Sequence, residues 1–225
     1  MKSFIVFDCY QTLIYKKELE KIVQRFCLQD LKKRIPLNFI ESAFQTIYDR
    51  YKLKDPAFNT QQERKKFYII YNKELFKILG ISISNKEAIL LNHQLKKSEW
   101  GCYSDTLSAL KLLKSQEFSL GLISNWTKSL KSVIDSLELS CYFDFVYSSA
   151  QIEIEKPNPK IFTKILYSAM NQFDNIYYVG NDYELDIVPS KEAGLIPILI
   201  DRDNRYPYSD CIRIKKLTEI INIVL

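Results

Sequence analysis

Histidine is almost absent from the sequence, which contains only His93 among its 225 residues. A lone imidazole cannot supply a site built on several histidine ligands, and Ser-His-Asp schemes lose most of their candidates. Because His93 lies in a stretch with helical spacing, we expect a solvated or packed structural residue. The cysteines are odd in number, widely spaced and without a Cys-x-x-Cys pair, which speaks against zinc and disulfide frameworks. We expect reduced, mostly buried thiols at Cys9, Cys27, Cys102, Cys141 and Cys211.

Long hydrophobic runs and basic blocks are also missing. No apolar run approaches the roughly 20 residues that cross a bilayer. The short stretch Phe4–Phe7 ends in Asp8 rather than in a small-residue cleavage site, so we expect no signal peptide. The 32 Lys and Arg residues exceed the 27 Asp and Glu residues by only 5, and the lysines are scattered. We therefore expect a cytoplasmic globular protein that binds neither nucleic acid nor a membrane, with its oligomeric state left open.

Short apolar runs predict buried parallel strands. They are Phe4–Phe7, Ser119–Ile123, Phe143–Tyr147, Asn175–Val179 and Ile196–Ile200. Stretches with apolar residues at helical spacing lie between the later runs, at Thr106–Leu113, Thr127–Leu137, Pro159–Met170 and Ile187–Ala193. This alternation predicts an α/β fold with a doubly wound parallel sheet, in which the functional site lies at the carboxyl ends of the strands.

Residues 16–100 break the alternation, because they contain long amphipathic segments and little strand signal. The predicted helices are Lys17–Lys33, Leu37–Lys52, Gln61–Leu79 and Asn85–Lys97. Pro36, Pro56 and Gly80 stand where helices should begin or end. We therefore expect an all-helical domain at 16–100, inserted into an α/β core that comprises 1–15 and 101–225.

Polar side chains follow several of the predicted strands. Asp8 ends the first strand, Ser124 follows the second, Lys156 comes after the third, and Asp182 and Asp186 follow the fourth. Because the carboxyl ends of parallel strands meet at one edge of a sheet, we expect these side chains to face one another. Carboxylates with one lysine and one hydroxyl suit a site that binds a hard cation and stabilises an anion.

The segments around these residues resemble the motifs of the haloacid dehalogenase superfamily, a group of aspartate-nucleophile hydrolases that includes many small-molecule phosphatases. The matching segments, in chain order, are Phe7-Asp8-Cys9-Tyr10-Gln11-Thr12-Leu13, Leu122-Ile123-Ser124-Asn125, Lys156-Pro157-Asn158-Pro159 and Val179-Gly180-Asn181-Asp182 with Asp186. The helical insert occupies the place of the cap domain in one branch of this superfamily. The resemblance implies a Rossmann-type core and a small-molecule substrate.

Residue by residue, the resemblance implies that Asp8 is the covalent nucleophile. Ser124 would hydrogen-bond the substrate oxyanion, and Lys156 would neutralise charge between the nucleophile and the bound anion. We also expect Thr12 and Asn125 to contribute to substrate binding.

In the phosphatases of the superfamily, the resemblance further implies a Mg²⁺ cofactor. Its ligands here would be Asp8, the main-chain carbonyl of Tyr10, and the residues of the fourth motif, Asn181, Asp182 and Asp186. Which of Asn181 and Asp182 contacts the metal is open, because Asn181 stands where the family usually has its first acid.

Two further departures from the family pattern affect the expected chemistry. Tyr10 stands where phosphatases have the aspartate that protonates the leaving group, and an aromatic residue there is typical of the dehalogenases. General acid–base catalysis is worth about 10²–10⁴ in rate, so we expect alkyl phosphates to be poor substrates. Esters with acidic leaving groups should still be hydrolysed, because these groups leave without a proton. Gln11 replaces the usual Gly; if its φ is positive, the strain is about 1 kcal/mol or more.

Three hypotheses follow. The first is a Mg²⁺-dependent phosphatase of a small phosphorylated metabolite, which Asp182 and Asp186 favour. The second is a metal-independent 2-haloacid dehalogenase, which Tyr10 favours, although Arg50 is only a loose candidate for holding a substrate carboxylate. The third is a binding module of the same fold with little turnover.

Overall fold

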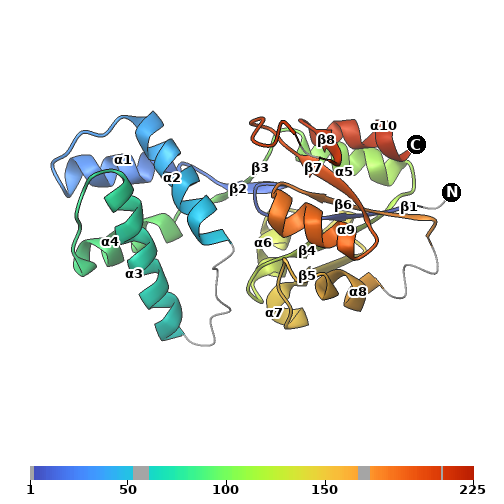
Figure 1. Cartoon of the computed structure of the whole chain (residues 1–225), viewed down its shortest axis with the longest axis horizontal. Helices are drawn as coiled ribbons and strands as arrows, with labels where there is room; N and C mark the ends of the chain where they lie inside the picture. The colour runs from blue at the N-terminus through green and yellow to red at the C-terminus, as the bar shows by residue number, and fades with distance from the viewer. Residues whose placement is uncertain (1–2, 53–60, 167–172, 209) are drawn as a thin grey trace. The chain divides into compact units, whose positions relative to one another are not determined.

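The computed structural model describes residues 3–52, 61–166, 173–208 and 210–225 (Figure 1). The chain forms two compact units, one of Met1–Tyr15 with Trp100–Leu225 and the other of Lys16–Glu99. The helical unit therefore ends at Glu99, one residue before the predicted end at residue 100. The two connections between the units are paired with each other, because the strands β2 (Ile14–Lys16) and β3 (Trp100–Cys102) form a two-stranded sheet.

The larger unit contains a six-stranded sheet in the order β5-β4-β1-β6-β7-β8, and every neighbouring pair is parallel. The strands are β1 (Ser3–Phe7), β4 (Ser119–Ser124), β5 (Phe145–Ser148), β6 (Asn175–Gly180), β7 (Ile196–Ile200) and β8 (Ile212–Ile214). Every residue of β1 is buried. A strand that is covered on both faces needs apolar side chains at successive positions, which explains the unbroken runs in the sequence.

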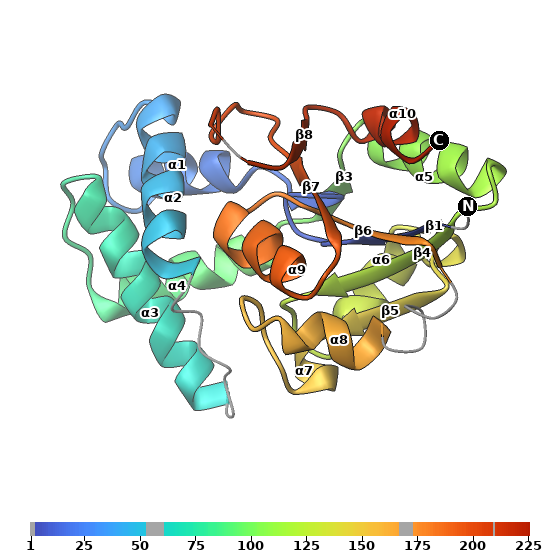
Figure 2. The ribbon, with the colours of Figure 1, turned by 45° about the vertical axis from the view of Figure 1, so that its right-hand side comes forward.

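Helices cover both faces of this sheet. They are α5 (Thr106–Ser115), α6 (Leu130–Ser136), α7 (Ser149–Ile152), α8 (Lys160–Leu166), α9 (Val188–Glu192) and α10 (Ile221–Val224). Ile5 and Phe7 share a core cluster with side chains of α5 and α6, whereas Phe4 and Val6 share another with side chains of α7 and α8. Figure 2 shows α5 and α10 on the side of the sheet opposite to α7 and α8. The predicted doubly wound α/β fold is confirmed.

The order of the strands determines where a site can form. The chain places β4 and β5 on one side of β1, and then crosses to place β6, β7 and β8 on the other side. The carboxyl ends of β4, β1 and β6 are therefore adjacent, at the point where the direction of winding reverses. The residues that end or follow these three strands are Ser124, Asp8 and Asn181.

The smaller unit is all-helical, with α1 (Leu19–Gln29), α2 (Leu37–Tyr51), α3 (Gln61–Ile78) and α4 (Asn85–Lys96). Each helix contributes to one buried apolar cluster, for example through Phe26, Ile47, Phe76 and Leu91. Ser84 caps α4 in a capping box, because its hydroxyl accepts the Glu87 amide and the Glu87 carboxylate accepts the Ser84 amide. Among the described helices, none is long and apolar enough to cross a membrane.

Several elements differ from the sequence predictions. The strands β2, β3 and β8 were missed, because each has only three residues and no apolar run. Helix α6 begins at Leu130 rather than Thr127, and β5 begins at Phe145 rather than Phe143. Pro56 and the predicted helical residues 167–170 lie outside the described residues.

The cysteine prediction was wrong in part. All five cysteines are free thiols, as expected, but only Cys9 and Cys27 are buried, whereas Cys141 is exposed. The other two, Cys102 and Cys211, are half-buried. His93 is exposed near the end of α4, which agrees with the structural role expected for it.

Candidate active site

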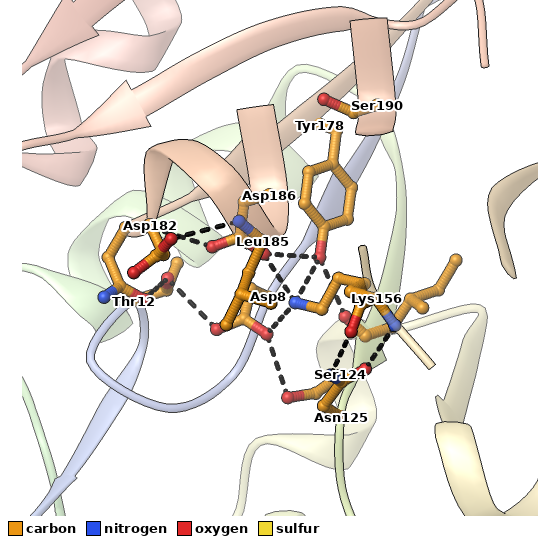
Figure 3. A network of polar contacts seen from close by, with 12 residues as sticks. Asp8, Thr12, Ser124, Asn125, Lys156, Tyr178, Asp182, Leu185, Asp186 and Ser190 are labelled. Atoms are coloured by element: carbon orange, nitrogen blue, oxygen red, sulfur yellow. Dashed lines mark hydrogen bonds and ion pairs between the residues drawn. The ribbon is translucent and has the colours of Figure 1, made fainter. Parts of the chain in front are cut away.

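Asp8 lies at the carboxyl end of β1 and is only 4% exposed (Figure 3). Its amide donates to the carbonyl of Val179 at 2.8 Å, which extends the hydrogen bonding between β1 and β6 by one bond. Its Oδ1 accepts hydrogen bonds from the Ser124 hydroxyl at 2.9 Å and from the Lys156 ammonium at 2.7 Å. Its Oδ2 has a longer contact, 3.4 Å, with the Thr12 hydroxyl. The two oxygens therefore face different partners.

The Lys156 ammonium is the centre of the site. It donates to Asp8 Oδ1 at 2.7 Å, to Asp186 Oδ1 at 2.5 Å and to the Tyr178 hydroxyl at 3.0 Å. These three acceptors use all three ammonium hydrogens. Burial alone would lower the pKa of Lys156, but the carboxylates of Asp186 and Asp8 outweigh that effect and raise the pKa well above its ordinary value. Lys156 therefore remains a cation in the interior.

Asn125 fixes the backbone that carries this lysine. Its Nδ2 donates to the Lys156 carbonyl at 2.9 Å, and its Oδ1 accepts the Lys156 amide at 2.8 Å. Both polar ends of the Asn125 side chain are thus engaged by the main chain of one residue. Asn125 was expected to contribute to substrate binding, whereas these contacts give it the geometry of a residue that positions Lys156.

Asp186 approaches Lys156 closely because the chain has no side chain at Gly180. A Cβ at Gly180 would lie 2.4 Å from the Asp186 Cβ, so the fourth motif requires glycine there. The second oxygen of Asp186 accepts the Asp182 amide at 3.0 Å. Burial raises the pKa of Asp186 to about 6, although Lys156 acts in the opposite direction. Both carboxylate oxygens of Asp186 are therefore engaged by the protein.

Asp182 has a different local role. Its Oδ1 accepts the amides of Glu184 and Leu185, each at 3.0 Å, and so caps the π-helical turn Tyr183–Ile187. This turn brings Asp186 back beneath the end of β6. The Asp182 side chain is 1% exposed.

Asn181 is linked through the Thr12 hydroxyl to Oδ2 of Asp8, whereas Lys156 contacts Oδ1. The Oδ1 of Asn181 accepts the Thr12 hydroxyl at 3.1 Å, and the same hydroxyl contacts Asp8 Oδ2. Its Nδ2 donates to Gln11 Oε1 at 3.2 Å. Gln11 has a φ of 62°, so the left-handed backbone expected for the usual glycine is retained here by a glutamine. Two of the residues that depart from the family pattern therefore contact each other.

Tyr10 brings no acid to the site. Its ring packs edge-on against Trp100 at 6.0 Å between centroids, and Trp100 packs against Trp126 at 5.0 Å. Cys9 turns away from the site into the core, where it is fully buried and burial raises the pKa of its thiol. Arg50 forms an ion pair with Glu74 at 2.9 Å within the helical unit.

Tyr178 is a site residue that the sequence analysis missed, because it lies inside an apolar strand. It is fully buried, and burial raises its pKa well above the ordinary tyrosine value, so the hydroxyl stays protonated. The hydroxyl accepts from Lys156 and donates to the Ile123 carbonyl at 3.0 Å. The sequence did contain an indication of this role: a tyrosine within a predicted buried strand needs a hydrogen-bond partner for its hydroxyl.

The model of the haloacid dehalogenase-like hydrolase family matches residues 37–200 of the chain. Because this span is most of the chain, the protein belongs to the haloacid dehalogenase-like hydrolases. It is a hydrolase of that family, with the Rossmann-type core that the resemblance implied.

Individual relatives support this assignment. Haloacid dehalogenase-like hydrolase domain-containing protein 3 of Danio rerio is 23% identical over 207 residues, which cover 88% of this chain and 85% of that protein. A glyceraldehyde 3-phosphate phosphatase of Methanothermobacter thermautotrophicus is 31% identical over 117 residues, which cover 49% of this chain and 50% of that protein. A magnesium-bound crystal structure of YfnB from Bacillus subtilis, a protein assigned as a HAD-hydrolase, has a TM-score of 0.71 at 16% identity, covering 99% of this chain and 98% of that chain, which shows a shared fold.

Replacing Tyr178 with phenylalanine should destabilise the site. The variant leaves one Lys156 hydrogen and the Ile123 carbonyl without their buried partner, which costs about 1–3 kcal/mol. Urea unfolding of Tyr178→Phe measures this loss. Tyr177→Phe is the matched control, because Tyr177 packs in the core cluster on the opposite face of the same strand. Equal destabilisation by the two variants would contradict the role given to the Tyr178 hydroxyl.

Proposed function

We propose that the protein is a phosphatase that uses Asp8 as a covalent nucleophile on a small phosphorylated metabolite, with Mg²⁺ as cofactor. The observation that carries the proposal is the buried Asp8 carboxylate, held on one oxygen by Ser124 and Lys156 and in contact on the other with the Thr12 hydroxyl, which in turn contacts Asn181. The 31% identity to a glyceraldehyde 3-phosphate phosphatase supports a phosphate ester as substrate.

The proposed reaction has two displacements. A carboxylate oxygen of Asp8 forms a bond to phosphorus, and the phosphorus–oxygen bond to the leaving group breaks, with its electron pair staying on that group. Ser124 and Lys156 would then donate the hydrogens that contact Asp8 Oδ1 to oxygens of the bound phosphoryl group, which carry the charge. Water next attacks the aspartyl phosphate, releasing inorganic phosphate and restoring the carboxylate.

The leaving group must depart without an acid from position 10. Tyr10 packs on Trp100 and has no carboxyl group to protonate an alkoxide. A phenolate or another weakly basic leaving group needs no such proton, because it is stable as an anion. The substrate class that this site favours is therefore a phosphate ester or anhydride with an acidic leaving group.

Oxygen donors on one side of Asp8 fit a magnesium ion. We assign the ligands as Asp8, the main-chain carbonyl of Tyr10, and the Oδ1 of Asn181, a set without nitrogen or sulfur. Gln11 accepts one amide hydrogen of Asn181, and the amide oxygen accepts the Thr12 hydroxyl, which also contacts Asp8. Both oxygens of Asp186 are engaged by Lys156 and by the Asp182 amide, and Oδ1 of Asp182 accepts two backbone amides, so we assign these two residues a supporting role. When bound, Mg²⁺ would neutralise phosphoryl charge.

Among the described residues, no cluster of three or more His, Cys, Asp and Glu side chains could hold a metal. This agrees with a site of one carboxylate, one amide and one carbonyl, which attracts Mg²⁺ less strongly than a site with several carboxylates. We therefore expect weak, saturable metal dependence.

Tyr10 also favours a second function, the hydrolysis of 2-haloacids. A halide leaves without a proton, so an aromatic residue at this position is compatible with that reaction. The same Asp8 would attack carbon instead of phosphorus, and no metal would be needed. Halide release from 2-haloacids in the presence of a chelator distinguishes this function from the phosphatase.

The leaving-group argument predicts a substrate preference. The purified protein should hydrolyse an aryl phosphate with Mg²⁺, and an alkyl phosphate about 10²–10⁴ times more slowly. Tyr10→Asp should raise the alkyl rate selectively, whereas Tyr10→Asn, of similar size but without an acid, should not. Asp8→Asn should abolish both activities. Equal alkyl and aryl rates in the unaltered protein would contradict the account of Tyr10.

The ligand assignment predicts opposite effects at two neighbouring residues. Asn181→Asp adds a carboxylate beside Asp8 and should tighten Mg²⁺ binding at least about tenfold, or about 1.4 kcal/mol, in calorimetric titrations. Asp182→Ala removes the oxygen that accepts the Glu184 and Leu185 amides, so it should lower stability by about 0.5–2 kcal/mol while leaving the Mg²⁺ affinity nearly unchanged. If Asp182→Ala abolished Mg²⁺ binding and Asn181→Asp had no effect, the two roles would be reversed.

A further inference from the structure

Arg202 follows β7 and contacts the loop that carries the nucleophile. Its Nη1 and Nη2 donate to the two oxygens of Asp105 at 2.8 and 3.0 Å, which makes a bidentate ion pair. Its Nη2 also donates to the Thr12 carbonyl at 3.2 Å. The guanidinium lies over the ring of Tyr103, 4.1 Å from the centroid. The side chain is 19% exposed, so this is a largely buried contact.

Asp105 is fixed from two directions. Besides Arg202, its Oδ2 accepts the amide of Leu217 at 2.8 Å. Burial would raise the pKa of Asp105, but the hydrogen bonds from Arg202 and Leu217 outweigh it, and the pKa lies below its ordinary value. The carboxylate therefore stays charged, and the guanidinium is held in a single orientation.

Residues close to Asp105 in the chain bind the next carbonyl of the loop, that of Leu13. The Leu13 carbonyl accepts the Tyr103 amide at 3.1 Å and the Thr106 hydroxyl at 2.7 Å. Thus two successive carbonyls, those of Thr12 and Leu13, are bound from outside the loop. On the inner side, the Thr12 hydroxyl contacts Asp8 Oδ2 and Asn181 Oδ1.

The loop needs an external support because it contains a strained residue. Gln11 has a φ of 62°, a conformation that side chains other than glycine rarely adopt. Such residues persist where the surrounding structure holds them in place. Within the loop, the Gln11 amide donates to the Ile14 carbonyl, and the amides of Leu13 and Ile14 donate to the Cys9 carbonyl.

We infer that Arg202, oriented by Asp105, is a positioning residue that holds the Gln11–Leu13 turn so that the Thr12 hydroxyl faces the nucleophile. This inference rests on the proposed function for its effect on catalysis. Arg202 touches no reacting atom. It acts through the Thr12 carbonyl, and a small displacement of the turn moves Thr12 and Asn181 relative to Asp8. Displacements of about 1 Å can cost about a hundredfold in rate.

The test compares Arg202→Gln with a matched control. Arg213→Gln also removes an arginine that pairs with a buried aspartate, Asp201, at 3.3 Å, but the described contacts of Arg213 do not include the nucleophile loop. Arg202→Lys keeps the charge but not the bidentate geometry, and it serves if Arg202→Gln does not fold. Two quantities are measured: kcat and KM for an aryl phosphate, and amide hydrogen exchange of a peptide that spans residues 9–14.

We expect both Arg202 variants to lower kcat about tenfold to a hundredfold, with little change in KM, and to accelerate exchange in residues 9–14. Arg213→Gln should leave both quantities near those of the unaltered protein. Similar effects of Arg213→Gln and Arg202→Gln would overturn the inference, because they would reflect stability alone. Unchanged exchange in the Arg202 variants would overturn it as well.

Failure of the proposed function gives a different result. If the unaltered protein hydrolysed no phosphate ester, the proposed function would fail, and the exchange measurement alone would decide whether Arg202 holds the loop. If the unaltered protein were active and only the exchange prediction failed, the proposed function would stand without this role for Arg202.

Discussion

The buried ammonium of Lys156 is the interaction on which the rest of the site depends. A cation at 3% side-chain exposure is costly to bury unless it is paired and fully hydrogen-bonded. Asp8, Asp186 and Tyr178 meet both requirements: Asp8 follows β1, Tyr178 lies within β6, and Asp186 lies in the turn after β6. The doubly wound topology places β1 and β6 side by side and so brings these residues together. The same contacts that keep Lys156 charged also orient the Asp8 carboxylate, so the stability of the core and the orientation of the proposed nucleophile share one set of bonds.

Gln11 and Asn181, two of the residues that depart from the family pattern, contact each other and act together. Gln11 keeps the left-handed backbone that the family gives to glycine, and its side chain orients Asn181. Asn181 in turn presents an amide oxygen beside Asp8 through Thr12. With Tyr10 packed on Trp100, the site has no carboxyl group at position 10, and Asn181 stands where the family usually has an acid. On the proposed function, the site would keep the nucleophile and its lysine while restricting the leaving groups it can serve.

Apolar runs were sufficient to predict the parallel sheet and the helical unit, because a strand covered on both faces must be apolar throughout. The convergence of Asp8, Ser124 and Lys156 also followed from strand ends alone. Tyr178 and Arg202 did not follow, since a hydroxyl inside an apolar strand and an arginine after β7 gain their meaning only from partners far away in the chain. The roles of Asn181 and Asp182 depend on a π-helical turn, which local sequence does not specify.

The most direct test of the central claim is to trap the covalent intermediate on Asp8. The protein is mixed with a limiting amount of aryl phosphate and Mg²⁺, quenched within one turnover and treated with borohydride, which reduces an aspartyl phosphate to homoserine. Mass spectrometry of the peptide that contains residue 8 should then find homoserine at that position, and only when substrate was present. Turnover of the substrate with Asp8 unmodified throughout would contradict the account, because the nucleophile would then lie elsewhere.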